Sequence, residues 1–187
     1  IIIAHFILEV KGFWAYSGKF FAIIRVNRNT GGTDLDETFA VKDDFDLIVY
    51  QMPRELREMH LYPLGDLHKD SELFDIRLWE RWKKVVFNDP YAYIVLVGDL
   101  FDNSLKSSKG NSYANSGRTN ESKRWMANEL KPMKDRILAG VDGNHEYRSV
   151  YAADNSPLED VMCKLDLEDL FRSNRAFLKI SLGDKNQ

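Results

Sequence analysis

The stretch that most constrains the fold is Tyr91–Asn103, which reads YAYIVLVGDLFDN. Its first half is apolar and β-branched and is too short for a helix of ordinary length, which is typical of a strand buried on both faces of a parallel sheet. The run ends at once in Gly98 and Asp99, and a second carboxylate follows at Asp102. Because open α/β sheets bind ligands beyond the carboxyl ends of their strands, these two carboxylates are predicted to lie at a binding site.

Two other apolar runs end in the same way. The first precedes Asp66 and His68, and the second, residues 137–141, precedes Asn144 and His145. In a locally extended segment Asp66 and His68 would point to the same side, and a carboxylate beside an imidazole suits Zn, Fe or Mn. Each motif alone also fits a surface carboxylate or a structural histidine. Together, at three strand ends, they predict one shared metal centre on one sheet edge.

Composition sets the broad class. A chain of 187 residues with 44% apolar and 29% charged residues is long enough for one globular domain with a sizeable core. Its net charge of -3 argues against polyanion binding by the whole surface. The single cysteine, Cys163, excludes an internal disulfide and fits a reducing compartment. With no apolar run of roughly 18 residues and no signal peptide predicted, we expect a cytoplasmic location and no membrane partner.

The chain divides into two regions. Residues 1–58 are predicted to be a β-rich N-terminal extension of uncertain fold, with strands such as Phe20–Val26 and Leu47–Tyr50. The acidic segment 34–46 lacks the spacing of a calcium loop, so a solvated face is favoured there. Residues 59–187 are predicted to form the α/β domain that carries the three motifs.

Helices are expected between the strands of this domain. One is predicted over residues 72–87 with Ser71 as its N-cap, and another over residues 121–130 with a further turn behind it. Ser156 is predicted to cap a third helix, and residues 176–182 alternate like a half-exposed strand. Strands alternating with helices indicate βαβ units and an α/β fold with a parallel sheet.

The three motifs together match the first three signature motifs of a known family. They are DxH at Asp66 and His68, GDxxD at Asp99 and Asp102, and GNHE at Gly143, Asn144, His145 and Glu146. Over about residues 60–187 the chain therefore resembles the calcineurin-like metallophosphoesterases. The GDLFD variant looks like the DNA-repair nuclease branch, and the region from residue 143 to residue 160 resembles phage-encoded members.

The resemblance implies the N-terminal half of a two-sheet αββα sandwich with a site for two divalent metal ions. The ions would be Mn, with Fe or Zn as alternatives. By the same resemblance Asp66 and His68 hold the first metal, Asp99 bridges both, and Asn144 holds the second. The family hydrolyses phosphoesters by attack of a metal-bound hydroxide, and the cations neutralise the growing charge.

The resemblance also implies catalytic roles beside the metals. His145 would protonate the leaving oxygen, and Asp102 would orient it through a hydrogen bond. Arg148 either contacts a substrate phosphate or is a surface arginine that points outward. The excess of basic residues between residues 106 and 136 could guide a phosphate backbone, although an ordinary solvated surface is slightly favoured.

One departure from the family concerns its later histidines, which include a GHxH motif. This chain has histidines only at His5, His60, His68 and His145. We therefore expect a natural chain that continues past Gln187, and weak metal binding by the 187 residues alone. The leading hypothesis is a metal-dependent phosphoesterase, either a nuclease-like phosphodiesterase acting on DNA or a nucleotide, or a phosphomonoesterase. The alternatives are a catalytically incomplete scaffold that binds a protein partner, and a nucleic-acid-binding module without chemistry.

Overall fold

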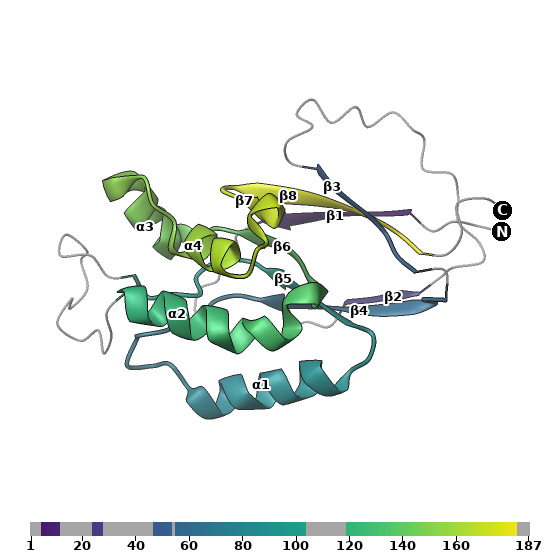
Figure 1. The fold of residues 1–187 in the computed structure, drawn as a ribbon, viewed down its shortest axis with the longest axis horizontal. Helices are drawn as coiled ribbons and strands as arrows, with labels where there is room; N and C mark the ends of the chain where they lie inside the picture. The colour runs from purple at the N-terminus through teal and green to yellow at the C-terminus, as the bar shows by residue number, and fades with distance from the viewer. Residues whose placement is uncertain (1–4, 12–23, 28–46, 54, 104–118, 183–187) are drawn as a thin grey trace.

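A computed structural model describes five parts of the chain, shown in colour in Figure 1. They are residues 5–11, 24–27, 47–53, 55–103 and 119–182. The acidic segment 34–46, the first residues of the strand predicted at Phe20–Val26, and most of the basic loop after residue 103 lie outside the described residues.

The larger sheet has five strands in the order β2-β4-β5-β6-β7. Four of them run parallel: β4 (Glu58–Leu64), β5 (Ala92–Leu96), β6 (Ile137–Val141) and β7 (Phe171–Arg172). The fifth strand, β2 (Ile24–Asn27), pairs with β4 in the antiparallel direction. The parallel strands predicted from the apolar runs are confirmed.

The smaller sheet has the order β1-β8-β3. Its central strand β8 (Arg175–Ser181) is antiparallel to β1 (His5–Lys11) and parallel to β3 (Leu47–Gln51). Three strands from the first 58 residues are thus hydrogen-bonded into the two sheets. The predicted division of the chain at residue 58 is not tested by this pairing and stays a proposal.

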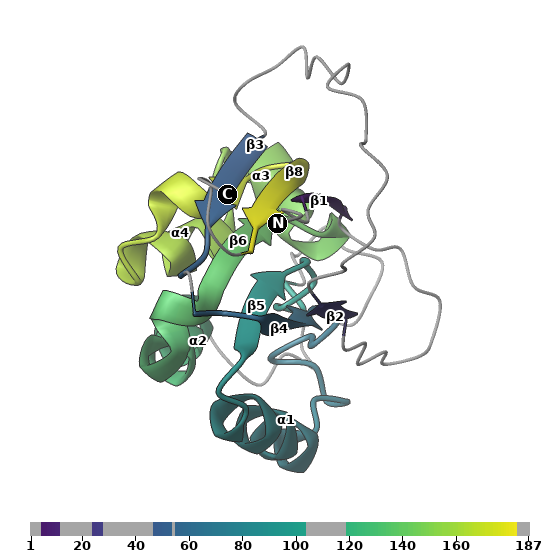
Figure 2. The same ribbon diagram turned by 90° about the vertical axis from the view of Figure 1, so that its right-hand side faces the viewer.

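Alternate side chains of the larger sheet face two separate cores. Ile94 and Leu96 of β5 pack among the helices, while Val95 between them packs with Leu178 and Ile180 of the smaller sheet. This is the period of two that a strand buried on both faces requires. The two sheets lie face to face, and the helices α1 and α2 cover the other side of the larger sheet (Figures 1 and 2). The predicted α/β fold is confirmed, with both sheets and one helical layer of the expected half-sandwich.

The first helix, α1 (Ile76–Asn88), starts later than predicted. Its N-cap is Asp75, whose Oδ1 accepts hydrogen bonds from the backbone N–H of Arg77 at 2.9 Å and of Leu78 at 3.3 Å. The prediction of Ser71 as the cap is wrong. The Ser71 hydroxyl instead accepts from the Leu73 N–H at 3.2 Å, because residues 71–74 form a separate turn before the helix.

The remaining helices follow the predicted order. Helix α2 (Thr119–Leu130) continues into the 3₁₀ turn η2 (Lys131–Arg136), as predicted. Helix α4 (Pro157–Lys164) begins at Ser156, whose hydroxyl accepts from the Glu159 N–H at 3.1 Å and confirms the predicted cap. A short 3₁₀ turn, η3 (Glu168–Leu170), leads into β7.

The residues of the third motif lie at the start of a helix. Asn144, His145 and Glu146 form the first turn of α3 (Asn144–Ala153), which follows Gly143 directly. The helix starts this early because the Glu146 carboxylate reaches back to the Gly143 N–H at 3.0 Å. That contact satisfies one of the backbone donors that a helix start leaves open.

Candidate metal centre

The loops that follow β4 and β5 run side by side at the carboxyl edge of the larger sheet. Backbone N–H groups of Leu67 and His68 donate to the Asp99 carbonyl at 2.9 and 3.0 Å, and the Lys69 N–H donates to Leu100 at 2.8 Å. The pairing of the strands thus continues into the motifs. The candidate metal ligands of the first loop are thereby held against those of the second.

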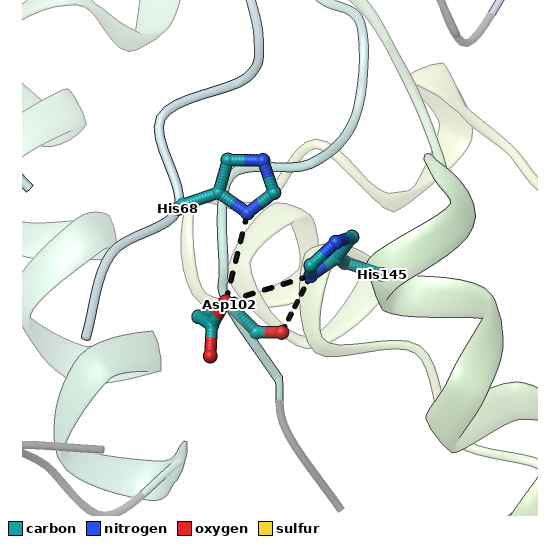
Figure 3. Close-up of side chains that lie close together, drawn as sticks. All are labelled: His68, Asp102 and His145. Carbon is teal, nitrogen blue, oxygen red and sulfur yellow. Dashed lines mark hydrogen bonds and ion pairs between the residues drawn. The ribbon is translucent and has the colours of Figure 1, made fainter. Parts of the chain in front are cut away.

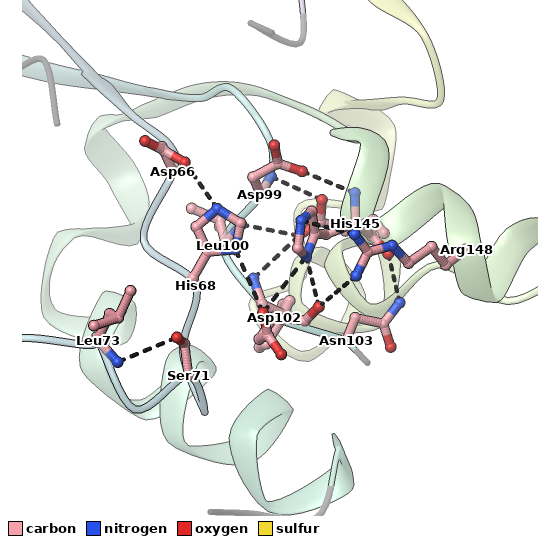
Figure 4. Close-up of polar contacts among 12 residues, drawn as sticks. Asp66, His68, Ser71, Leu73, Asp99, Leu100, Asp102, Asn103, His145 and Arg148 are labelled. Atoms are coloured by element: carbon pink, nitrogen blue, oxygen red, sulfur yellow. Dashed lines mark hydrogen bonds and ion pairs between the residues drawn. The ribbon is translucent and has the colours of Figure 1, made fainter. Parts of the chain in front are cut away.

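The backbone at these motifs is not extended. Asp66, His68 and Asp99 have φ values of 53, 48 and 53°, in the left-handed region. The prediction that Asp66 and His68 lie in an extended segment is therefore wrong, although their side chains do meet, with His68 Nε2 2.8 Å from Asp66 Oδ1 (Figure 4). Non-glycine residues in this region are uncommon and cluster at functional sites.

Atoms that could ligate a metal converge in two overlapping groups. Asp66, His68 and Asp99 form one, and His68, Asp102 and His145 form the other; within each group the ligand atoms lie within 4.8 Å of one another. Figure 3 shows the second group, with the imidazoles of His68 and His145 beside Asp102. Two imidazoles among three carboxylates suit divalent transition metals, so the donor set fits the ions that the sequence predicts.

Asp99 lies at the middle of this arrangement. Its side chain is 7% exposed, and Oδ1 accepts a hydrogen bond from the His145 N–H at 2.8 Å. The carboxylate therefore connects the loop after β5 to the start of α3. Asn144 precedes His145 as the first residue of that helix and is half-buried, and its role as a metal ligand stays a prediction.

His145 is oriented by Asp102, but by the backbone of that residue. Its Nδ1 lies 2.6 Å from the Asp102 carbonyl oxygen and 3.8 Å from the carboxylate Oδ1. A carbonyl only accepts, so Nδ1 carries a proton. Asp102 therefore orients His145 as predicted, but through its backbone carbonyl. Its carboxylate Oδ1 lies 3.8 Å from Nδ1 of both His145 and His68.

Arg148 points into the site (Figure 4). Its Nη2 lies 3.0 Å from His145 Nε2 and its Nη1 donates to the Asp102 carbonyl at 3.2 Å. Of the two alternatives, the outward-pointing arginine is therefore wrong, while phosphate binding stays a prediction. A guanidinium only donates, so this geometry describes a neutral His145. Burial lowers the pKa of His145, against the raising effect of the Asp102 carbonyl, and the charges of His68 and Arg148 lower it further.

Sequence reasoning gave no role to Glu146, which the structure places at the centre of the loops. Its side chain is fully buried. The two carboxylate oxygens accept from four backbone N–H groups, at 2.8 to 3.2 Å: those of Asp99, Leu100, Phe101 and Gly143. Burial raises the pKa of Glu146, although these hydrogen bonds act against the rise. Its position three residues after Gly143, at the third position of a helix, is the signal that could have indicated this role.

Asn103 is a second residue that the sequence did not single out. It is 7% exposed, and its Nδ2 donates to the His145 carbonyl at 2.7 Å and to the Ser149 hydroxyl at 2.8 Å. These contacts attach α3 to the end of the second motif. Helix α3 is therefore held to the loop after β5 by two residues, its own Glu146 and Asn103 of that loop.

The fold and these contacts define an α/β protein with a candidate metal centre at the carboxyl edge of its parallel sheet. Residues 59–182 match the family model described as calcineurin-like phosphoesterase, and the chain belongs to that family. None of the curated proteins and none of the solved structures compared with the chain matches it. The family is one of metal-dependent phosphoesterases, which confirms the family resemblance and the general activity class. The nuclease and phage branches stay predictions. In the described part of the chain, no helix has the length and apolarity to cross a membrane.

Proposed function

We propose that this chain is a nuclease-like phosphodiesterase that uses two divalent metal ions, Mn or alternatively Fe or Zn. The observation that carries the proposal is the convergence within 4.8 Å of candidate ligand atoms that follow β4, β5 and β6, two half-buried histidines among them. Residue types that ligate metals, brought to one point from three separated motifs, are what a shared metal site requires.

Four side chains would hold the ions. Asp66 and His68 would hold the first, Asp99 would be shared by both, and Asn144 would hold the second. Bound ions would lower the pKa of a coordinated water and offset the negative charge that develops on the phosphoryl oxygens. The position of Asp99, within 4.8 Å of the candidate ligand atoms of Asp66 and His68 and bonded to the first turn of α3, supports the bridging role.

His145 would act as the general acid. The Asp102 carbonyl holds the Nδ1–H, which leaves Nε2 to carry the proton that passes to the leaving oxygen. In the structure Arg148 occupies that side of the ring. A bound phosphate would draw the guanidinium onto its own oxygens and would raise the pKa of the imidazole, because a negative charge favours the protonated ring. Arg148 thus binds substrate and releases Nε2 in one movement.

Substitution of Asp99 and His145 tests this function. We expect Asp99→Asn to abolish manganese-dependent hydrolysis of a phosphodiester, because the amide lacks the charge of the bridging ligand. His145→Ala should slow esters with poor leaving groups by about 100-fold or more and esters with good leaving groups much less. Rates are measured with and without a chelator, on paired esters that differ in the pKa of the leaving group.

The matched control is Asp169→Asn, which removes an exposed carboxylate from η3. It should leave the rate unchanged. Equal rates for the wild-type chain and for Asp99→Asn would contradict the mechanism. Manganese binding by the wild-type chain without hydrolysis of any ester would favour the non-catalytic scaffold instead.

A further inference from the structure

One face of α3 carries exposed tyrosines in line with the candidate metal centre. Asn144, Tyr147, Arg148 and Tyr151 are spaced i, i+3, i+4 and i+7, and residues at this spacing lie on one face of a helix. Tyr147 is 42% exposed and Tyr151 is 93% exposed. We call these two residues the tyrosine strip.

The helix face that carries the tyrosine strip begins beside the candidate metal centre and leads away from it. At one end of the face is Asn144, and beside it Arg148 contacts His145 Nε2 at 3.0 Å. With a rise of about 1.5 Å per residue, Tyr147 lies about 5 Å and Tyr151 about 10 Å along the helix from Asn144. A group joined covalently to a phosphate at the metal centre can therefore reach both rings.

The exposed rings of the tyrosine strip are suited to stacking against the planar rings of a ligand. The Tyr147 hydroxyl donates to Asn174 Oδ1 at 3.1 Å, which restrains the direction of that ring. The one acidic residue of α3 is Glu146, whose carboxylate is buried and directed at backbone N–H groups. The exposed face of this helix therefore presents two aromatic rings, with the half-buried Arg148 guanidinium beside them near the site and the exposed C-cap Asp154 at the far end.

We propose that the tyrosine strip binds the bases of a single-stranded nucleic acid whose phosphate lies at the metal centre. This inference rests on the proposed function and names its substrate class. Tyrosine rings stack on nucleobases of any sequence, and an unpaired strand exposes the ring faces that a duplex hides. The two tyrosines are about 6 Å apart along the helix, so neighbouring bases of one strand can each contact one ring.

Binding to two oligomers of equal charge tests the proposal. The probes are a fluorescently labelled oligothymidylate and a base-free oligomer with the same number of phosphates, and the readout is anisotropy in the presence of a chelator, so that no strand is cut. The wild-type chain should bind the base-containing oligomer more tightly. Tyr151→Ala should weaken that binding about tenfold and leave the base-free oligomer unaffected, because stacking contributes about 1–3 kcal/mol per base.

Variants that retain or lack a ring face separate stacking from stability. Tyr151→Trp should bind as tightly as the wild-type chain, whereas Tyr151→Leu should behave like Tyr151→Ala. The control Phe87→Ala removes a 59% exposed aromatic ring at the C-terminal end of α1, and it should change neither affinity. Equal affinity of the wild-type chain for the two oligomers, or an unchanged affinity in Tyr151→Ala, would overturn the proposal.

The binding experiment does not depend on catalysis. If the base-containing oligomer binds through Tyr151 but no ester is hydrolysed, the tyrosine strip is supported and the proposed hydrolysis fails. If Asp99→Asn abolishes hydrolysis but Tyr151→Ala leaves the affinity unchanged, the phosphodiesterase is supported and the strip fails.

Discussion

At the scale of single residues, Glu146 has the largest structural role in the candidate site. One buried carboxylate accepts hydrogen bonds from the backbones of both the second and the third motif. Hydrogen bonds to an ionised acceptor are about twice as strong as neutral ones, and they are strongest where water is excluded. The position of Asp99 relative to His145 is therefore set by a side chain outside the proposed ligand set.

Replacing Glu146 with glutamine should damage both stability and metal binding. The amide keeps one acceptor oxygen, but its NH₂ group would face backbone N–H groups that also donate, so at least one donor would be left buried and unpaired. We expect the free energy of unfolding to fall by about 2–4 kcal/mol and manganese affinity to fall with it. Urea unfolding and manganese titration calorimetry measure the two effects.

The matched control for that experiment is Glu159→Gln, in which the carboxylate is exposed on the first turn of α4. Its stability should stay within about 0.5 kcal/mol of the wild-type value. A Glu146→Gln chain as stable as this control would show that the four backbone contacts contribute little.

At the scale of elements, the close approach of two loops depends on paired glycines. Gly98 has a φ of +81°, and a Cβ on it would lie 2.2 Å from the Gly143 nitrogen. A Cβ on Gly143 would lie 2.3 Å from Asp99 Oδ1. Both distances are far below van der Waals contact, so the loops after β5 and β6 can touch only when neither position carries a side chain.

Gly143→Ala should therefore displace the Asp99 carboxylate and the N-terminus of α3. We expect the free energy of unfolding to fall by about 1–3 kcal/mol, measured by urea unfolding, and manganese binding to be lost, measured by calorimetry. Gly140→Ala is the internal comparison, because its Cβ would meet the flexible Met162 side chain at 3.2 Å. Retained metal affinity in Gly143→Ala would contradict the importance of this contact.

The elements that sequence reasoning predicted well are those fixed by burial. Residues 137–141 form β6 with the predicted bounds, because a fully buried strand must be apolar at every position. The cap of α1 was placed wrongly because Ser71 and Asp75 are both good caps, and the intervening turn is set by tertiary packing of Phe74 against the core.

Several residues named from the sequence lie together in the structure, but their roles stay predictions and their geometry was not predicted. The spacing of Asp66 and His68 indicated a shared direction, and the left-handed backbone that brings about their contact has no local sequence signal. The carbonyl contact of Asp102 and the inward direction of Arg148 depend on how α3 packs on the loop after β5, which a linear motif does not record.

At the scale of the whole molecule, a histidine lies between two carboxylates at the end of the larger sheet opposite the candidate site. His60 Nδ1 lies 2.6 Å from Asp89 Oδ2 and its Nε2 lies 2.8 Å from Glu58 Oε1. Tyr62 donates to the same Asp89 oxygen at 2.7 Å. The hydrogen bond to Glu58 and that to Asp89 raise the pKa of His60, despite its partial burial.

Stability should consequently depend on the protonation of His60. The folded chain holds the imidazole proton more tightly than the unfolded chain, whose pKa is about 6.5. The stabilisation is therefore complete below about pH 6.5 and is lost as pH rises through the higher pKa of the folded state. The free energy of unfolding of the wild-type chain should exceed that of His60→Asn by about 1–2 kcal/mol more at low pH than at high pH.

The measurement is urea unfolding of the wild-type chain and of His60→Asn at pH values below and above 6.5. A chelator is present to remove metal effects. The variant Tyr91→Ala, which alters the ring packed edge-on against His60 at 5.9 Å but neither carboxylate, should keep the pH dependence. A constant difference in stability between the wild-type chain and His60→Asn at every pH would rule out the proton-linked contact.

The order β1-β8-β3 has a consequence for synthesis on the ribosome. The neighbours of β8, residues 5–11 and 47–51, leave the exit tunnel long before residues 175–181 are translated. Until then, both early strands carry unsatisfied edges that invite intermolecular pairing, while β4, β5 and β6 can already assemble. Chaperone capture of nascent chains should therefore be greatest before residues 175–181 leave the exit tunnel and should drop once β8 has emerged.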